Sequence, residues 1–194
     1  IPAGEFLMGH DNGQYDEKPQ RTIYVSLFCM DRLEVTNLEY GKCVDDGACD
    51  QGPSSDDQRG GGEDRPAVGV NWYDADKFCR WRGARLPTEA AGARAARGPD
   101  GRLFPWGKEA KGGVANCGQG CEDFYTLASP VGCFPDGASP YGVLDMSGNA
   151  AEWVADYYRE GYTKSSPDRD PQGPGQGLMR VIKGGCFRDH VQVV

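Results

Sequence analysis

The residues best suited to chemistry lie in the segment GVLDMSGNAAEW at positions 142–153. Its oxygen-bearing side chains stand at short intervals around a glycine; they are Asp145, Ser147, Asn149 and Glu152. Carboxylate and carbonyl oxygens around a glycine turn are the ligands that a hard cation such as calcium needs. The alternative is that these side chains are solvated or cap turns.

Eight cysteines form a second group of chemically active residues. They lack the C-x-x-C spacing of zinc ribbons and redox sites. Cys43 and Cys49 enclose a short glycine-containing loop, and so do Cys117 and Cys121, so we expect a local disulfide at each place. Disulfides would place the chain outside the cytoplasm, in the periplasm, on the cell surface or secreted. Reduced cysteines buried as small apolar residues are the alternative.

The composition limits the class of protein. A length of 194 residues suits one domain with a core, while 29 glycines and 13 prolines favour a loop-rich fold. A net charge of −8 disfavours nucleic acid and anionic membranes as partners, and the chain has no apolar run that could span a bilayer. Because the sequence opens inside a motif at Ile1–Gly4, without Met or a signal peptide, we expect a processed or incomplete chain.

Three helices are predicted from their caps. Thr36 and Glu39 form a capping box before a helix over 37–44. Asn71 can cap a second helix over 72–82, which would bury a stripe made of Ala75, Phe78, Cys79 and Trp81. The segment 86–89 caps a third helix that runs to Ala96 and ends at Gly98.

The strands are read from apolar alternation. Residues 5–9 predict one strand, and residues 21–35 predict another, or two with a bend, with Ile23, Val25, Leu27 and Cys29 on one face. Residues 131–134 predict a short buried piece, and residues 179–187 predict a core strand. Segments 45–65 and 159–177 are polar and should form exposed loops.

A series of motifs in fixed order extends along nearly the whole chain. They are IPAGEFLMG at 1–9, DEKP at 16–19, MDRLEVTN at 30–37, VGVNWYDA at 68–75, RLPTE at 85–89, FPWG at 104–107, GVLDMSGN at 142–149 and VIKGG at 181–185. Together they resemble the formylglycine-generating enzyme, or sulfatase-modifying factor, family. The resemblance implies an α+β, C-type-lectin-like fold, loop-rich with peripheral helices. We expect a single domain over 1–194, incomplete at both ends.

The resemblance also implies two structural calcium sites. In the first, the ligands would be the side chains of Asp145 and Glu152 with the carbonyls of Gly148 and Ala150. In the second, they would be the side chains of Asn116 and Asp123 with the carbonyls of Cys117 and Tyr125, and Glu17 as a further ligand. These sets contain oxygen donors and no histidine, which suits calcium over zinc or copper.

Family enzymes oxidise a substrate cysteine to formylglycine with oxygen, copper and a cysteine pair. The matching positions here hold Asp189 and Val194, which cannot bind Cu(I) as thiolates do, so copper is not expected. Cys186 stands where the family usually has serine; it is one thiol, and it could be bonded to another cysteine such as Cys133. We therefore assign no catalytic residue and no organic cofactor.

Other branches of the family use histidine-bound iron. This chain has only His10 and His190, which lie in no H-x-x-H cluster, so a histidine–metal site is not expected. Ala151 replaces a tryptophan that is usual in the family, a change that fits a divergent member.

The sequence thus predicts a noncatalytic, calcium-stabilised extracytoplasmic module. It would bind a protein or glycan, or serve as an accessory subunit of a larger assembly. The alternative is an oxidoreductase or maturation factor that converts a substrate cysteine to formylglycine in a sulfatase.

Overall fold

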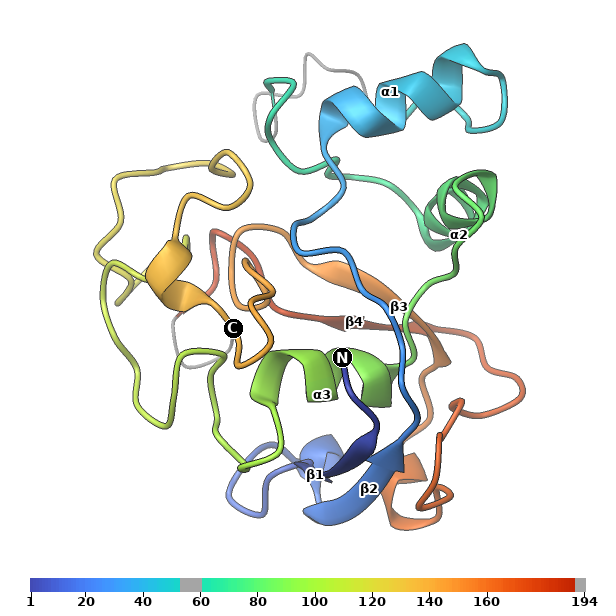
Figure 1. Cartoon of the computed structure of the whole chain (residues 1–194), viewed down its shortest axis with the longest axis vertical. Helices are drawn as coiled ribbons and strands as arrows, with labels where there is room; N and C mark the ends of the chain where they lie inside the picture. Colours follow the sequence, from blue (N-terminus) through green and yellow to red (C-terminus); the bar gives the residue numbers. More distant parts are fainter. Residues whose placement is uncertain (53–60, 191–194) are drawn as a thin grey trace.

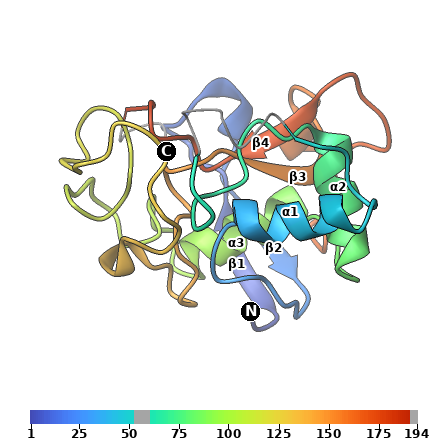
Figure 2. The ribbon, with the colours of Figure 1, turned by 90° about the horizontal axis from the view of Figure 1, so that it is seen from above.

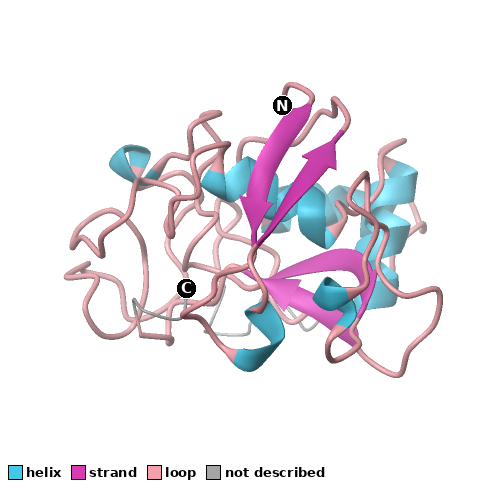
Figure 3. Cartoon of the chain, turned by 90° about the horizontal axis from the view of Figure 1, so that it is seen from below, coloured by secondary structure: helices cyan, strands magenta, loops and turns pink. Residues whose placement is uncertain are grey.

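The computed structural model describes residues 1–52 and 61–190. In that part of the chain, the four strands are β1 Gly4–Met8, β2 Arg21–Val25, β3 Glu152–Tyr157 and β4 Arg180–Lys183. The helices are α1 Asn37–Asp45, α2 Trp72–Trp81 and α3 Glu89–Arg97, with short 3-10 turns η1 Tyr15–Glu17, η2 Pro135–Gly137 and η3 Tyr162–Lys164. The strands form two separate antiparallel pairs, β1–β2 and β3–β4. The helices and strands gather on one side, and the loops of residues 98–150 fill the other (Figures 2 and 3).

Helix α3 lies between the two sheets and contacts strands of both (Figure 1). Its sequence, EAAGARAAR, explains this position, because alanine and glycine let backbones approach closely from both sides. Ala90 and Ala91 pack with Phe6 and Ile23, which face each other in the β1–β2 pair. The expectation of peripheral helices is therefore wrong for α3, whereas α1 and α2 pack together at one end of the molecule (Figure 1).

The helix caps follow the sequence closely. Thr36 Oγ1 accepts a hydrogen bond from Glu39 N at 3.2 Å, and the Glu39 carboxylate accepts from Thr36 N at 3.1 Å, so the capping box is confirmed. Asn71 caps α2, and Thr88 and Gly98 bound α3. These local signals succeed because each of them satisfies N–H or C=O groups that the helix itself leaves unpaired.

The buried face of α2 differs from the prediction. Phe78 is buried and stacks on Tyr40 of α1, but Trp81 is 37% exposed. Trp81 instead donates from Nε1 to an oxygen of Asp46, at the end of α1. The spacing of apolar residues along a helix identifies the side that faces its neighbours. How many residues of that side are buried depends on how much of α2 is covered by α1.

Two predicted strand segments are not confirmed. β2 ends at Val25, because the next residue donates its N–H to the Asp170 carboxylate at 2.7 Å instead of continuing the ladder. Leu27 is 72% exposed, and Cys29 is exposed too. The piece at 131–134 forms no strand, and its Cys133 is exposed.

β4 forms at the predicted place but is not a core strand. It pairs only with β3, and Ile182 is 48% exposed. The described part of the chain contains no helix long and apolar enough to cross a membrane.

Asp156 joins β3 to α3 and so fixes where the segment 142–153 enters the sheet. Its carboxylate accepts from Glu89 N, the first N–H of α3, at 2.9 Å. The side chain is buried, and burial raises the pKa of Asp156 to about 6.

Gly92 in the middle of α3 provides a test of this packing. A Cβ built there would meet only Val154 Cγ1, at 4.0 Å, which is an ordinary contact. We therefore expect Gly92→Ala to raise the free energy of unfolding in urea by about 1 kcal/mol, through helix propensity alone.

The matched control is Gly98→Ala at the end of the same helix. Gly98 has φ +63°, and a Cβ there would lie 2.6 Å from Pro140 Cγ, so this variant should be less stable than the wild type. A Gly92→Ala variant that unfolds more easily than the wild type would show that α3 has no room between the sheets.

Candidate metal-binding site

The loop-rich side of the molecule is organised around the side chain of Asn149, which is 0% exposed. Asn149 Oδ1 accepts from Ser129 N at 2.8 Å and from Asn116 Nδ2 at 3.1 Å. Asn149 Nδ2 donates to Glu34 Oε2 at 2.7 Å. The backbone of Asn149 takes part as well, since its N–H donates to Asn116 O at 2.7 Å and its carbonyl accepts from Phe187 N at 3.0 Å. One residue therefore joins five segments that are far apart in sequence.

Asn116 completes this network but leaves one atom unsatisfied. Its Nδ2 donates to Leu127 O at 2.9 Å as well as to Asn149. Among the described residues, its Oδ1 is a buried oxygen without a hydrogen-bond partner. Buried polar atoms in proteins are normally paired, so an orphaned acceptor indicates a missing donor or cation. Asn116 is one of the predicted calcium ligands.

The Asp123 carboxylate lies in the same loop as Asn116. It accepts from Cys117 N at 3.1 Å and from Tyr125 N at 2.8 Å. These contacts bring together Asp123 and the two residues whose carbonyls were predicted as ligands. The structure therefore joins three of the five residues predicted for the second calcium site through backbone N–H groups, and Asn116 directly precedes one of them in the chain.

Glu17 is the fifth residue of that set, and it lies elsewhere. It belongs to η1, in the loop between β1 and β2, and its carboxylate accepts from Gln14 N at 2.7 Å. Its backbone carbonyl accepts from His10 N at 3.1 Å. These are contacts within its own loop, so its role as a ligand stays a prediction.

The first predicted calcium site contains two carboxyl groups whose pKa values are raised by burial. Asp145 is buried, with φ +56°, and accepts from Gly132 N at 2.6 Å. Burial raises the pKa of Asp145, and burial together with the charge of Asp145 raises the pKa of Glu152 to about 7. Acidic groups held close together away from water disfavour their own ionisation unless a cation compensates the charge.

Glu34 contacts the backbone of the segment that forms this predicted site. Its Oε1 accepts from Ala150 N at 3.0 Å, next to the Asn149 amide that its other oxygen holds. Burial raises the pKa of Glu34 well above its usual range, and Glu152 and Asp145 raise it further. Glu34 is not among the site residues predicted from the sequence. The available signal was an acid between Leu33 and Val35, in one of the recurring motifs.

The donor set determines which metal these residues could hold. The described part of the chain has no cluster of three histidine, cysteine or acidic side chains arranged for a metal ion. A cation here would thus depend on carbonyl and amide oxygens as well as carboxylates, as calcium sites do. The residues present fit calcium, and they do not suit zinc or copper.

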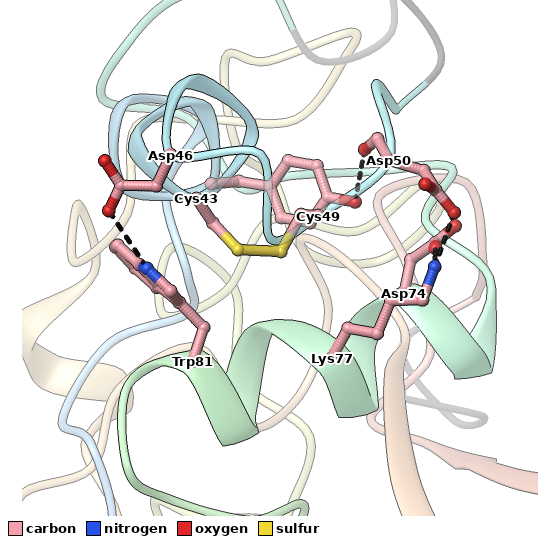
Figure 4. The surroundings of a disulfide bond; sticks show 8 residues. Cys43, Asp46, Cys49, Asp50, Asp74, Lys77 and Trp81 are labelled. Atoms are coloured by element: carbon pink, nitrogen blue, oxygen red, sulfur yellow. Dashed lines mark hydrogen bonds and ion pairs between the residues drawn. A yellow bond between two sulfur atoms is a disulfide. The ribbon is translucent and has the colours of Figure 1, made fainter.

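Both predicted local disulfides are present. Cys43–Cys49 links the end of α1 to the following loop, where it lies above α2 between the Asp46–Trp81 and Asp50–Lys77 contacts (Figure 4). Cys117–Cys121 closes the loop next to Asn116. Both of its cysteines are buried with Ala115 and against Trp106, so this disulfide is the apolar centre of the loop.

The suggested Cys133–Cys186 bond is wrong, because both cysteines are free. Burial, with the nearby Asp189 carboxylate, raises the pKa of the Cys186 thiol, which therefore favours the protonated, weakly nucleophilic form. Asp189, at the position matched to the first catalytic cysteine, accepts from Cys186 N at 2.8 Å and closes a turn. Val194, matched to the second, lies outside the described residues.

Replacing Asn149 tests the importance of the buried network. We expect Asn149→Ala to lower the free energy of unfolding by roughly 3 kcal/mol, because it leaves several buried partners unsatisfied at once. The exposed Asn12→Ala should change it by less than about 0.5 kcal/mol. Urea denaturation measures both, and equal effects would contradict the central role of Asn149.

The chain is similar to known proteins over nearly its whole length. The profile described as Sulfatase-modifying factor enzyme 1-like domain matches residues 1–194. The chain is 34% identical, over 97% of its length, to the serine/threonine-protein kinase pkn1 of Chlamydia caviae, of which it covers 32%. It is 32% identical, over 98% of its length, to the formylglycine-generating enzyme of Bos taurus, of which it covers 65%. The chain thus spans about a third of the kinase and about two thirds of the enzyme.

A solved structure has a similar fold. The structure of PvdO from Pseudomonas aeruginosa matches 99% of this chain and 82% of its own chain, with a TM-score of 0.76 and 28% identity. The loop-rich architecture with few helices agrees with this match. The chain belongs to the formylglycine-generating enzyme, or sulfatase-modifying factor, family.

Proposed function

We propose that this chain is a noncatalytic, calcium-stabilised binding or accessory module of the formylglycine-generating enzyme family. The observation that carries the proposal is the place of Asp189. Where the family's first catalytic cysteine belongs, this carboxylate closes a turn by accepting from Cys186 N. The same turn is tied to the Cys117–Cys121 loop, because Gly118 N donates to Asp189 O at 2.8 Å. The position serves to hold loops together, and it offers no thiolate to Cu(I).

The remaining thiol of this region does not replace the cysteine pair. Cys186 is a single free cysteine with a raised pKa. Catalytic cysteines lie in surroundings that lower the thiol pKa, such as a neighbouring cation or a helix N-terminus. The acidic neighbour Asp189 has the opposite effect.

Calcium is proposed as a structural ion at both sites. The orphaned Asn116 Oδ1 and the Asp123 carboxylate support the site at 116–125, with the carbonyls of Cys117 and Tyr125. The pKa values of Asp145 and Glu152 support the site at 145–152, with the carbonyls of Gly148 and Ala150. When bound, calcium supplies positive charge that compensates these acids and satisfies the orphaned oxygen. It stabilises the folded state because the unfolded chain does not bring the ligands together.

The two disulfides support an extracytoplasmic location, because such bonds persist in oxidising compartments. The chain covers 32% of the kinase relative, which supports a role as one part of a larger protein or assembly. Its partner would be a protein or a glycan, recognised by exposed loops on a C-type-lectin-like fold.

Removing calcium tests the structural role. Saturating calcium should stabilise the chain by about 3 kcal/mol at a concentration of 100 times Kd, and excess EGTA should lower the melting temperature by roughly 5–10 °C. Circular dichroism or calorimetry measures this change. The control is the double variant Asp123→Asn with Glu152→Gln, whose melting temperature should not respond to EGTA. An unchanged melting temperature of the wild type would refute calcium stabilisation.

A direct assay separates this proposal from the alternative, an oxidoreductase that matures a sulfatase. The chain is incubated with copper, oxygen and a cysteine-containing sulfatase peptide, and the peptide mass is measured. We expect no formylglycine, while a family member that carries the cysteine pair should produce it under the same conditions. Formation of formylglycine by this chain would refute the noncatalytic role.

A further inference from the structure

We propose that Glu34 and Asn149 are positioning residues that aim Asn116 Oδ1 at a bound cation and thereby couple the two calcium sites. This inference rests on the proposed calcium binding. The two sites would not be independent: an ion at 145–152 should raise the affinity for calcium at 116–125, and the converse should hold equally.

The side-chain amide of Asn149 has a single orientation that satisfies its neighbours. Ser129 N–H can act only as a donor, and it donates to Asn149 Oδ1 at 2.8 Å. The opposite end of the amide, Nδ2, then faces Glu34 Oε2 at 2.7 Å. A flipped amide would place an N–H group against the Ser129 N–H and leave both unpaired.

The orientation of the Asn149 amide fixes the orientation of the Asn116 amide. Because Asn149 Oδ1 is an acceptor, the group of Asn116 that contacts it at 3.1 Å must be the Nδ2 donor. Leu127 O accepts the other Nδ2 proton at 2.9 Å. Two acceptors thus fix Nδ2, and Oδ1 must point the other way, where the described residues offer it no partner. The unsatisfied oxygen is therefore held in place by a neighbouring side chain that belongs to the other site.

Glu34 connects the Asn149 amide to the 145–152 site. Glu34 holds Asn149 Nδ2 with one oxygen and Ala150 N with the other, at 3.0 Å. Ala150 contributes a predicted ligand carbonyl, so ordering that peptide also orders Glu34 and Asn149. The backbones of the two sites touch as well, since Asn149 N donates to Asn116 O at 2.7 Å. At Gly148 a Cβ would collide with this same oxygen, so a side chain has no room between the two loops.

These contacts have the properties that coupling requires. The amides of Asn116 and Asn149 are fully buried, and Glu34 is nearly so, so neither amide can exchange its partners for bulk water. A shift of Ala150 would move Glu34 and Asn149 together, and Asn116 Oδ1 with them. Binding at one site therefore removes conformational freedom at the other, and the second ion has less left to order.

The experiment measures calcium binding to the whole chain by isothermal titration calorimetry. Glu152→Gln disables the 145–152 site, and Asp123→Asn disables the 116–125 site. We expect Glu152→Gln to weaken calcium binding at 116–125 by at least about fivefold, and Asp123→Asn to weaken binding at 145–152 by the same factor. This reciprocity needs no variant of Glu34, so it tests the coupling even if such a variant does not fold.

Glu34→Gln then tests the route of the coupling. It keeps the size of the side chain but replaces one acceptor oxygen with an NH₂ group, so either Asn149 Nδ2 or Ala150 N loses its hydrogen bond to residue 34. In this background Glu152→Gln should change the Kd at 116–125 by less than about twofold, as for independent sites. The control is Ser139→Ala, which removes a buried hydroxyl that accepts from Val143 N at 3.3 Å outside this network and should leave the fivefold coupling intact.

The outcomes separate the two proposals. If the wild-type chain binds no calcium, or only one ion, both the coupling and the two-site calcium proposal are overturned. If it binds two ions whose affinities are unaffected by the variants of the other site, calcium binding stands and the coupling is refuted. Loss of coupling in Ser139→Ala as well as in Glu34→Gln would refute the role of Glu34, because general loosening of the loops would then explain both.

Discussion

The loop-rich side of this molecule depends on the buried amide of Asn149. Loops have no ladder of backbone hydrogen bonds, so each buried N–H and C=O group needs another partner. Asn149 supplies such partners with four groups, its side-chain oxygen and nitrogen and its backbone N–H and carbonyl. Its φ of +57° lies in the left-handed region, which asparagine tolerates better than most residues, and this conformation forms part of the bend at Gly148. The apolar core on this side is small, centred on the Cys117–Cys121 disulfide, so polar contacts bear much of the organisation.

The other side of the molecule is held together by apolar packing instead of a buried polar network. Here α3 is thin enough to lie between two sheets, and apolar packing against Phe6 and Ile23 dominates. Asp156 connects the two sides, because it lies in β3 three residues after the segment 142–153 and its carboxylate accepts the first N–H of α3. A second connection runs from Gly148 N to Gly184 O, at 2.7 Å, just after β4. The position of the candidate site therefore depends on the helix and the sheets, although most of its predicted ligands lie in loops and Glu152 is the first residue of β3.

The chain resembles its family in fold, but it differs at Asp189 from the family members that make formylglycine. Family members that make formylglycine use a cysteine pair, and this chain has a turn closed by Asp189 at the first of those positions. The turn is tied to the neighbouring loop through the hydrogen bond from Gly118 N to the backbone carbonyl of Asp189, next to residues 116–125. This arrangement fits the proposed structural role, in which these loops would hold a cation.

The sequence by itself determined the features that depend on neighbours in the chain. The capping box of Thr36 and Glu39, the caps of α2 and α3, and the two short-range disulfides were predictable because their partners stand within a few residues. Family membership was predictable because motifs keep their order. Only the tertiary structure decided the end of β2 at Val25, since an aspartate 144 residues away takes the next N–H. It also placed α3 between two sheets and left Cys133 and Cys186 unbonded. Glu34 shows the reason most clearly: its contacts with Asn149 and Ala150 span 115 and 116 residues, and no local pattern specifies which distant groups will meet in a buried polar network.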